Sequence, residues 1–214
     1  MIHLTRSGTT ITRANDELVA LRDEFSRVQC VRLRQLIDAD LLRTIHERLA
    51  HSEFRAFEST AIGRDWTLAD PALLHLLYML ANDPPFLQAI RDITGCEEIA
   101  MFQGRVYHMD PALGHDDSWH DDMRDNRLIA MSVNLSPAPF EGSAFQLRDR
   151  RSGEILHEVA NTGLGDAIIF RIAGHLQHRN TELTGSALKT AFAGWFRSHQ
   201  PDYYAWIRDQ PVTP

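Results

Sequence analysis

The sequence pattern of the chain changes near residue 98, and this change constrains the fold more than any other feature. Residues 1–97 carry mostly helical signals, whereas residues 98–198 consist of short apolar runs separated by turn residues. Several short strands at this spacing are typical of a sandwich or a barrel, and helices that precede them usually cover one face. We therefore expect an α+β fold, with residues 1–214 forming a single domain and residues 199–214 a C-terminal tail.

Capping residues and apolar residues at helical spacing predict four helices in the first part of the chain. Asp38 is placed to cap the second helix, and Asp70 followed by Pro71 is placed to begin the third. Gly95 is placed to end the fourth. The predicted helices cover residues 18–25, 38–49, 70–82 and 84–95, with a short strand at 28–33.

Short runs rich in β-branched and aromatic residues predict six strands in the second part of the chain. Segments rich in Gly, Pro, Ser and Asp separate them, such as "SPAPFEGS" and "NTGLGD". The predicted strands cover residues 98–109, 127–136, 143–149, 154–159, 166–172 and 189–198.

Composition argues against several classes of protein. The net charge of -7 does not favour a nucleic-acid partner, because phosphate contact needs a basic face. Two cysteines, Cys30 and Cys96, are too few for a disulfide framework or a four-thiolate zinc site. No apolar run approaches the length that crosses a bilayer, and the first residues lack the apolar core of a signal peptide. We therefore expect a cytoplasmic location and no membrane partner.

Two His-x-Asp pairs lie within ten residues, in the segment "GHDDSWHDDM" at 114–123. Two histidines and one carboxylate on one face, with open positions, form the metal site of non-haem Fe(II) oxygenases. Alternate residues of a strand point to the same side, so a His-x-Asp pair can direct both ligands at one metal. From the residues alone, the pair is either His115 and Asp117 or His120 and Asp122.

A third ligand has to come from a strand that is distant in the sequence. The segment "HLQHRN" follows the predicted strand at 166–172 and offers His175 and His178. Spacing alone does not decide between these two histidines, and a short His-rich segment is also typical of a solvent-exposed loop.

Six motifs in residues 100–198 occur in an order that resembles a known family. The order resembles that of the Fe(II)/2-oxoglutarate-dependent dioxygenases, particularly their prolyl-4-hydroxylase-like branch. One departure is Ser143, which stands where the family usually has a second glycine. The motifs are "GRVYHM", "SWHDDM", "RLIAMSVNLS", "FEGSAFQL", "GLGDAIIF" and "LQHRNTELTGSALKTAFAGWF".

The resemblance implies a fold. It predicts a double-stranded β-helix, or jelly-roll, core over residues 98–198, which would be the catalytic part. The helices of residues 1–97 would pack on one face of this core as a buttress.

The resemblance also implies a ligand set, in which His120, Asp122 and His178 hold the metal. "WHDD" with a strand directly after it is similar to the family's His-x-Asp motif. In the family a basic residue follows the distal histidine by about ten positions. Lys189 is eleven positions beyond His178 and fourteen beyond His175, so His178 is the better match.

The same resemblance implies that Lys189 binds the distal carboxylate of 2-oxoglutarate. An ammonium group deep in a barrel needs a carboxylate partner, because an unpaired buried charge is costly. Tyr107 is predicted to donate a hydrogen bond to the same carboxylate, and Thr190 is a weaker candidate. Arg127 and His115 remain candidates for contact with the substrate.

The activity implied by the resemblance is that of a 2-oxoglutarate-dependent non-haem iron dioxygenase. Such an enzyme uses Fe(II), 2-oxoglutarate and O2, with ascorbate as a supporting reductant, and releases succinate and CO2. We expect hydroxylation of a small molecule or an amino acid-like substrate. The alternatives are a peptidyl (prolyl) hydroxylase acting on a protein, a cupin-like metalloenzyme that does not use 2-oxoglutarate, and a binding module without a metal.

Overall fold

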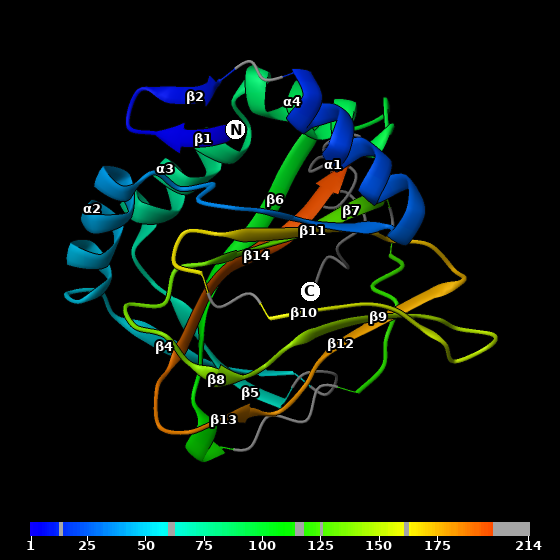
Figure 1. The fold of residues 1–214 in the computed structure, drawn as a ribbon. Helices are drawn as coiled ribbons and strands as arrows, with labels where there is room; N and C mark the ends of the chain where they lie inside the picture. Colours follow the sequence, from blue (N-terminus) through cyan, green and yellow to red (C-terminus); the bar gives the residue numbers. More distant parts are fainter. Residues whose placement is uncertain (13–14, 60–62, 114–117, 125, 161–162, 199–214) are drawn as a thin grey trace, which may run out of the picture.

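The structure is a computed structural model that describes residues 1–12, 15–59, 63–113, 118–124, 126–160 and 163–198. In the described part, a large antiparallel sheet packs against helices on one face and against a small sheet on the other (Figure 1). The helices are α1 (Asn15–Val28), α2 (Ala39–Leu49), α3 (Pro71–Ala81) and α4 (Pro84–Thr94), with a 3-10 turn at Pro111–Leu113. The strands are β1 (Ile2–Thr5), β2 (Gly8–Ile11), β3 (Cys30–Leu33), β4 (Phe54–Ser59), β5 (Gly63–Leu68), β6 (Met101–Met109), β7 (Arg127–Asn134), β8 (Glu141–Gly142), β9 (Phe145–Asp149), β10 (Ile155–Val159), β11 (Ala167–Arg171), β12 (Leu176–Asn180), β13 (Leu183–Thr184) and β14 (Lys189–Arg197).

The large sheet has the strand order β3-β11-β7-β14-β6-β5-β4, and all neighbouring strands are antiparallel. Its centre is β14, which pairs with β6 on one side and β7 on the other. Strands that are neighbours in this sheet are therefore often distant in the sequence. For example, β6 and β14, the first and the last strands of residues 98–198, lie side by side.

The run "AIIF" of β11 is apolar at every position because both faces of the large sheet are buried. Ala167 and Ile169 belong to the core shared with the helices. Ile168 and Phe170 point to the opposite face and pack with residues of the small sheet. The small sheet has the order β10-β9-β12 and contributes Phe145 to this second core.

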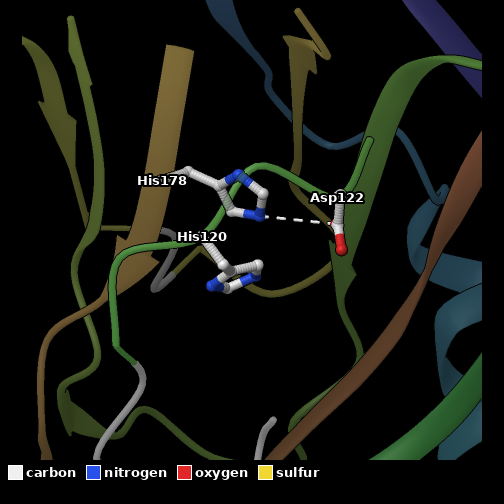
Figure 2. A group of neighbouring side chains, drawn as sticks. All are labelled: His120, Asp122 and His178. Carbon is white, nitrogen blue, oxygen red and sulfur yellow. Dashed lines mark ion pairs between the residues drawn. The ribbon is translucent and has the colours of Figure 1, made fainter. Parts of the chain in front are cut away.

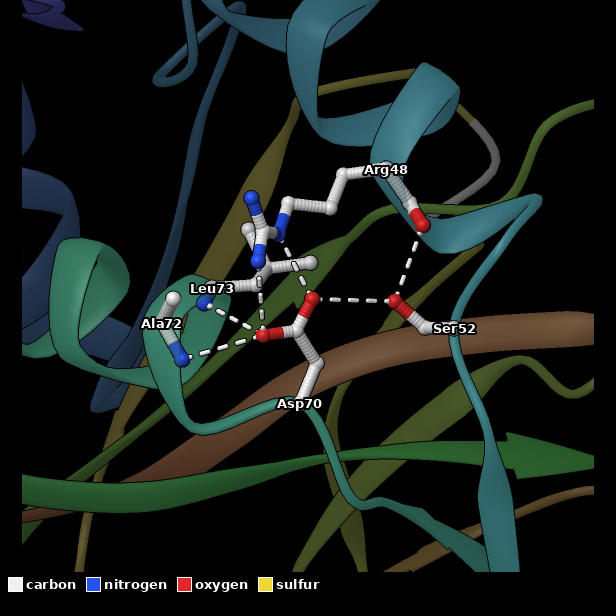
Figure 3. Close-up of polar contacts among 5 residues, drawn as sticks. All are labelled: Arg48, Ser52, Asp70, Ala72 and Leu73. Carbon is white, nitrogen blue, oxygen red and sulfur yellow. Dashed lines mark hydrogen bonds and ion pairs between the residues drawn. The ribbon is translucent and has the colours of Figure 1, made fainter.

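α2, α3 and α4 begin or end at capping residues predicted from the sequence, whereas α1 is longer than the predicted helix at 18–25. Asp70 caps α3 by accepting hydrogen bonds from the backbone N–H groups of Ala72 (3.0 Å) and Leu73 (3.1 Å), as Figure 3 shows. The same carboxylate accepts from Arg48 Nε at 2.6 Å and from the Ser52 hydroxyl at 3.2 Å. Arg48 belongs to α2, so one side chain both starts α3 and joins it to the preceding helix.

Two other predicted ends of helices are confirmed. The side chain of Asp38 accepts from the backbone N–H of Leu41 at the start of α2. Gly95 ends α4 in the left-handed conformation (φ 64°), which glycine adopts without steric cost. No helix in the described residues is both long and apolar enough to cross a membrane.

The first half of the chain contains strands that the sequence did not predict. β1 and β2 form a separate hairpin, and β4 and β5 form a second hairpin that extends the large sheet through β6. Trp66 lies on β5, in the part of the chain where mostly helical signals were found. Together with β3, these strands mean that residues 1–97 supply part of the sheet as well as the helices that cover it.

Candidate metal centre

Three side chains from two segments of the chain meet between the two sheets. His178 lies on β12 and is 7% exposed. The backbone of His120 exchanges two hydrogen bonds with that of His178, at 3.1 and 2.8 Å, as an isolated antiparallel bridge. This bridge brings the segment that contains Asp122 to the small sheet.

The ligand atoms of His120, Asp122 and His178 all lie within 4.8 Å of one another. Figure 2 shows the three side chains pointing toward one another, with His178 Nε2 at 3.4 Å from Asp122 Oδ2. Two imidazoles and one carboxylate on one side of a site suit a divalent first-row metal and leave further positions open. The donor set therefore fits an Fe(II) ion, with one ligand atom from each residue.

The orientation of His120 leaves the correct ring nitrogen for a metal. Its Nδ1 lies 2.8 Å from the backbone carbonyl oxygen of Ser118. Because a carbonyl oxygen only accepts hydrogen bonds, Nδ1 carries the proton of the neutral imidazole, and in this tautomer Nε2 has the free lone pair. A hydrogen bond of this kind fixes both the tautomer and the ring plane of a metal-binding histidine.

The carboxylate of Asp122 is fixed by two neighbours. Trp195 Nε1 donates a hydrogen bond of 2.9 Å to Oδ2. Arg127 Nη1 lies 3.7 Å from Oδ1, and its guanidinium covers the Trp195 ring at 3.4 Å from the ring centre. Burial raises the pKa of Asp122, but the hydrogen bond and charge of His178 and the hydrogen bond from Trp195 outweigh burial and lower the pKa to about 2.

The way in which the His-x-Asp pair converges differs from the sequence expectation. The expectation was that the pair lies just before the strand at 127–136, with both side chains on one side as in a strand. Instead Asp122 adopts a left-handed conformation (φ 52°) outside any strand, and this turn directs its carboxylate toward His178. Asp121, between the two, turns away and pairs with Arg150 at 3.2 Å.

A cavity of about 140 Å³ lies beside these three side chains, on the face of the large sheet that is opposite the helices. Residues of both sheets line this cavity. The lining residues are Arg105, Tyr107, Met109, His120, Asp122, Ala130, Met131, Ser132, Phe145, Ile168, Phe170, His178, Asn180, Lys189, Ala193, Gly194 and Trp195.

Lys189 lies in this cavity and is only 5% exposed. Its Nζ donates to the Ser143 hydroxyl at 2.7 Å and lies 3.5 Å from Asn180 Oδ1. Ser143 has φ 48°, in the left-handed region that favours glycine. The serine therefore adopts a backbone conformation suited to glycine, and its hydroxyl contacts the buried ammonium group.

Solved structures with this arrangement of strands and helices are known. A Pseudomonas putida prolyl-4-hydroxylase is similar with a TM-score of 0.62 and 20% identity, covering 86% of this chain and 100% of that one. A 2OG-Fe(II) oxygenase family oxidoreductase from Burkholderia pseudomallei gives 0.66 and 15%, covering 94% and 97%. The epimerase SnoN, in complex with Fe3+, alpha ketoglutarate and nogalamycin RO, gives 0.61 and 16%, covering 94% and 92%.

The chain has the fold of the 2OG-Fe(II) oxygenases. No protein-family model matches the sequence, and no curated protein matches it either. Among these comparisons, the likeness to the 2OG-Fe(II) oxygenases therefore comes from the arrangement of the chain in space.

Within this oxygenase fold, the structure separates the competing candidates for the distal histidine. His178 points into the cavity, whereas His175 is exposed in the turn before β12. His115 and Asp117 lie outside the described residues. Of the two His-x-Asp pairs, the described one is His120 and Asp122, and it lies next to His178.

The remaining candidates differ in position. Tyr107 lines the cavity from β6. Thr190 does not, because its hydroxyl faces the helix side of β14 and lies 2.8 Å from His108 Nδ1. Arg127, considered for contact with a substrate, instead contacts Asp122 and Trp195.

Several lining residues of the oxygenase fold were not assigned a role from the sequence. No contact with a metal ligand was predicted for Trp195, although it donates a hydrogen bond to Asp122. Asn180 and Arg105 were not considered, although both line the cavity. A signal existed for Asn180, because it lies two residues after His178 and so shares its face of β12. The same kind of signal existed for Arg105, because it lies two residues before Tyr107 on the predicted strand at 98–109 and so shares its face.

Proposed function

We propose that the protein is an Fe(II)- and 2-oxoglutarate-dependent oxygenase. The observation that carries this proposal is the convergence of His120, Asp122 and His178 at one cavity that also holds the buried Lys189. A donor set for one divalent metal and a cation for a distant carboxylate are the two requirements for binding 2-oxoglutarate at a metal. When bound, the iron would supply the redox chemistry that uses O2, oxidises 2-oxoglutarate to succinate and CO2, and hydroxylates the substrate.

The spacing of the side chains supports this proposal. His178 and Asn180 are on the same face of β12, roughly 7 Å apart along the strand. Lys189 Nζ lies 3.5 Å from Asn180 Oδ1, so the ammonium group lies next to the residue two positions along β12 from His178. A five-carbon dicarboxylate with one end at the metal would place its other carboxylate toward Lys189.

The protein groups have separate roles in this proposal. His120, Asp122 and His178 hold the metal, and Asp122 is ionised at neutral pH because its pKa is about 2. Lys189 neutralises the far carboxylate of 2-oxoglutarate, and the Tyr107 hydroxyl donates a hydrogen bond to the same molecule. Phe145 and Phe170 pack near His178 and limit the access of water to this side of the metal site.

We propose that the two facing sheets form the double-stranded β-helix core expected from the sequence. The seven-stranded sheet and the β10-β9-β12 sheet pack face to face with the cavity between them, which supports this topology. Residues 1–97 contribute strands and helices to the same unit, which supports one domain for residues 1–198. Residues 199–214, the expected tail, lie outside the described residues.

We propose a small molecule as the substrate. The cavity of about 140 Å³ is compact and is shared between both sheets. SnoN, which has a similar fold, forms a complex with nogalamycin RO, a small molecule. A peptide substrate remains the competing possibility, because a prolyl-4-hydroxylase has the same fold.

The first test is metal-dependent binding of 2-oxoglutarate. We expect the anaerobic protein to bind 2-oxoglutarate with Fe(II) and to lose this binding in Asp122→Asn, which removes a ligand charge but tolerates the left-handed backbone. We expect Lys189→Ala to weaken the binding roughly tenfold to a hundredfold, as for loss of a charged hydrogen bond, and Lys189→Arg to restore part of it. Unchanged binding in Lys189→Ala would favour a metalloenzyme that does not use 2-oxoglutarate.

The second test is turnover. Succinate release is measured with Fe(II), ascorbate and two panels, one of amino acids and other small molecules and one of proline-containing peptides. Stimulation by a small molecule supports the proposed substrate class, and stimulation by peptides alone contradicts it. Absence of 2-oxoglutarate binding and of succinate release with every substrate would contradict the proposed function itself.

A further inference from the structure

A second basic side chain lines the cavity and is not needed for the metal or for the far end of 2-oxoglutarate. Arg105 lies on β6, where Arg105, Tyr107 and Met109 alternate along the face that lines the cavity. Unlike the buried Lys189, Arg105 is only half-buried. It therefore lies at a more accessible part of the same cavity.

The strand register separates the two cations. On β14, Lys189 is opposite Met109, and Ala193 is opposite Arg105. Four residues separate these positions, which corresponds to roughly 13 Å along the sheet. The backbone positions of the two cations are therefore far enough apart for them to bind two different anionic groups.

The residues beside Arg105 on the neighbouring strands β14 and β7 have small side chains, which leaves space next to the arginine. Ala193 is the neighbour of Arg105 on β14, and Ser132 is the neighbour of Ala193 on β7. Both side chains are small and both line the cavity. A ligand group can therefore lie against the sheet here, between Arg105 and the side of the cavity formed by Ile168.

The surroundings of Arg105 orient its guanidinium. Its Nη1 donates to the Thr67 hydroxyl at 3.0 Å, and its Cζ lies 5.1 Å from the centre of the Tyr107 ring. These two contacts hold the guanidinium at the cavity wall. A guanidinium carries five N–H donors in a planar fork, and the geometry of this fork matches a carboxylate better than the single ammonium group of lysine does.

We propose that Arg105 binds the carboxylate of the primary substrate, and that this substrate is a small carboxylic acid. This inference rests on the proposed function, which assigns the metal and Lys189 to 2-oxoglutarate. The acid group would lie at Arg105, and the rest of the molecule would extend over Ala193 and Ser132 toward Asp122 and the metal.

The test measures binding without turnover. The protein is loaded with Zn(II) and 2-oxoglutarate, and calorimetry compares common L-amino acids and short monocarboxylic acids with their carboxamides. We expect at least one acid to bind about tenfold or more tightly than its carboxamide, as for a charge-assisted hydrogen bond. Arg105→Met should abolish this preference, and Arg105→Lys should retain part of it, because lysine keeps the charge but not the fork.

Two controls separate this inference from trivial explanations. Arg43→Met makes the same change of charge on α2, where Arg43 is exposed and pairs with Asp40, and it should leave the acid preference intact. Thermal unfolding and 2-oxoglutarate affinity are measured for each variant. Arg105→Met should keep the 2-oxoglutarate affinity of the wild type.

The outcomes are distinct. Equal binding of acids and carboxamides by the wild type, or an acid preference that survives in Arg105→Met, overturns the proposal for Arg105. A loss of 2-oxoglutarate affinity in Arg105→Met as large as that in Lys189→Ala assigns Arg105 to the cosubstrate and also overturns it. If the wild type does not bind 2-oxoglutarate in the presence of metal, the proposed function fails instead.

Discussion

The indole of Trp195 donates its only N–H to the same carboxylate oxygen of Asp122 that faces His178, at 2.9 Å and 3.4 Å respectively. The tryptophan comes from the central strand of the large sheet, and Asp122 comes from an irregular segment. Asp122 is a proposed metal ligand that does not belong to a strand. This hydrogen bond therefore joins it to β14, the most extensively paired strand of the described fold.

Trp195→Phe should weaken metal binding while preserving the fold. Phenylalanine fills most of the same space but cannot donate to Asp122, so the carboxylate loses one of the contacts that orient it. Loss of such an outer hydrogen bond typically lowers metal affinity by about tenfold to a hundredfold. Anaerobic calorimetry with Mn(II) measures the change. Trp66→Phe, at a 38% exposed position on β5, is the matched control, and equal affinity in the two variants would contradict the prediction.

Ser143→Gly should be more stable than Ser143→Ala. Both variants remove the hydroxyl that accepts from Lys189, but only glycine adopts φ 48° without steric cost. The left-handed conformation costs a residue with a Cβ roughly 1 kcal/mol, so the free energies of unfolding should differ by about that amount. Urea denaturation of the two variants measures the difference. Identical stabilities would mean that the segment relaxes to another backbone conformation.

Acid should destabilise the protein through His108. Burial lowers the pKa of His108 from 6.5 to about 4. An unfolded histidine therefore binds a proton at a higher pH than the folded one, so this contribution to stability is complete above pH 6.5 and is lost as the pH falls toward 4. Because the ring is only partly buried, we expect a loss of about 1–2 kcal/mol rather than the full value of the shift.

The measurement compares urea denaturation of the wild type and His108→Gln at about pH 7.5 and about pH 4.5, on either side of the range in which the unfolded histidine titrates. The wild type should lose more free energy of unfolding between these two pH values than the variant does, since glutamine does not titrate. A larger loss in the variant would show that His108 is not the group responsible.

Asp166→Asn should destabilise the fold strongly. The Asp166 side chain is 7% exposed, accepts from Arg32 at 2.5 and 2.8 Å, and accepts from the backbone N–H of Gln35 at 2.7 Å. The change leaves the guanidinium without its charged partner, which costs about 2–3 kcal/mol for a partly buried pair. Asp40→Asn breaks an exposed pair and should have little effect on thermal unfolding. Similar melting temperatures for the two variants would contradict this role of Asp166.

The parts of the fold that depend on local chemistry could be predicted from the sequence. Asp38, Asp70 and Gly95 mark helix ends because a side-chain cap or a left-handed glycine acts within one turn of the chain. The six strands predicted after residue 98 correspond to β6, β7, β9, β10, β11 and β14.

The strand that carries His178 was not predicted, for a physical reason. In β12 the inward residues are Leu176, His178 and Asn180, and the outward residues are Gln177 and Arg179. A strand that lines a polar site has polar residues on both faces, so the alternation of apolar and polar residues that normally marks a strand is lost.

Long-range pairing explains the other differences. In the part of the chain that the structure describes, the β4–β5 hairpin joins the large sheet through Trp66 and Thr67, opposite His108 and Tyr107. Nothing near residues 54–68 in the sequence indicates this partner. Likewise, the left-handed backbone at Asp122 could not be predicted, because the contacts that position this residue come from distant residues such as Trp195.

Lys189 and Trp195 lie on the same face of one strand, β14, six residues apart. One contacts the proposed site for the far carboxylate of 2-oxoglutarate, and the other contacts a proposed metal ligand. Their separation is therefore set by the covalent repeat of a single extended backbone, which hardly stretches, and not by how separate elements pack. This fixed spacing selects the cosubstrate by its length. Longer or shorter dicarboxylates should therefore bind more weakly than 2-oxoglutarate, even if the surrounding loops adapt.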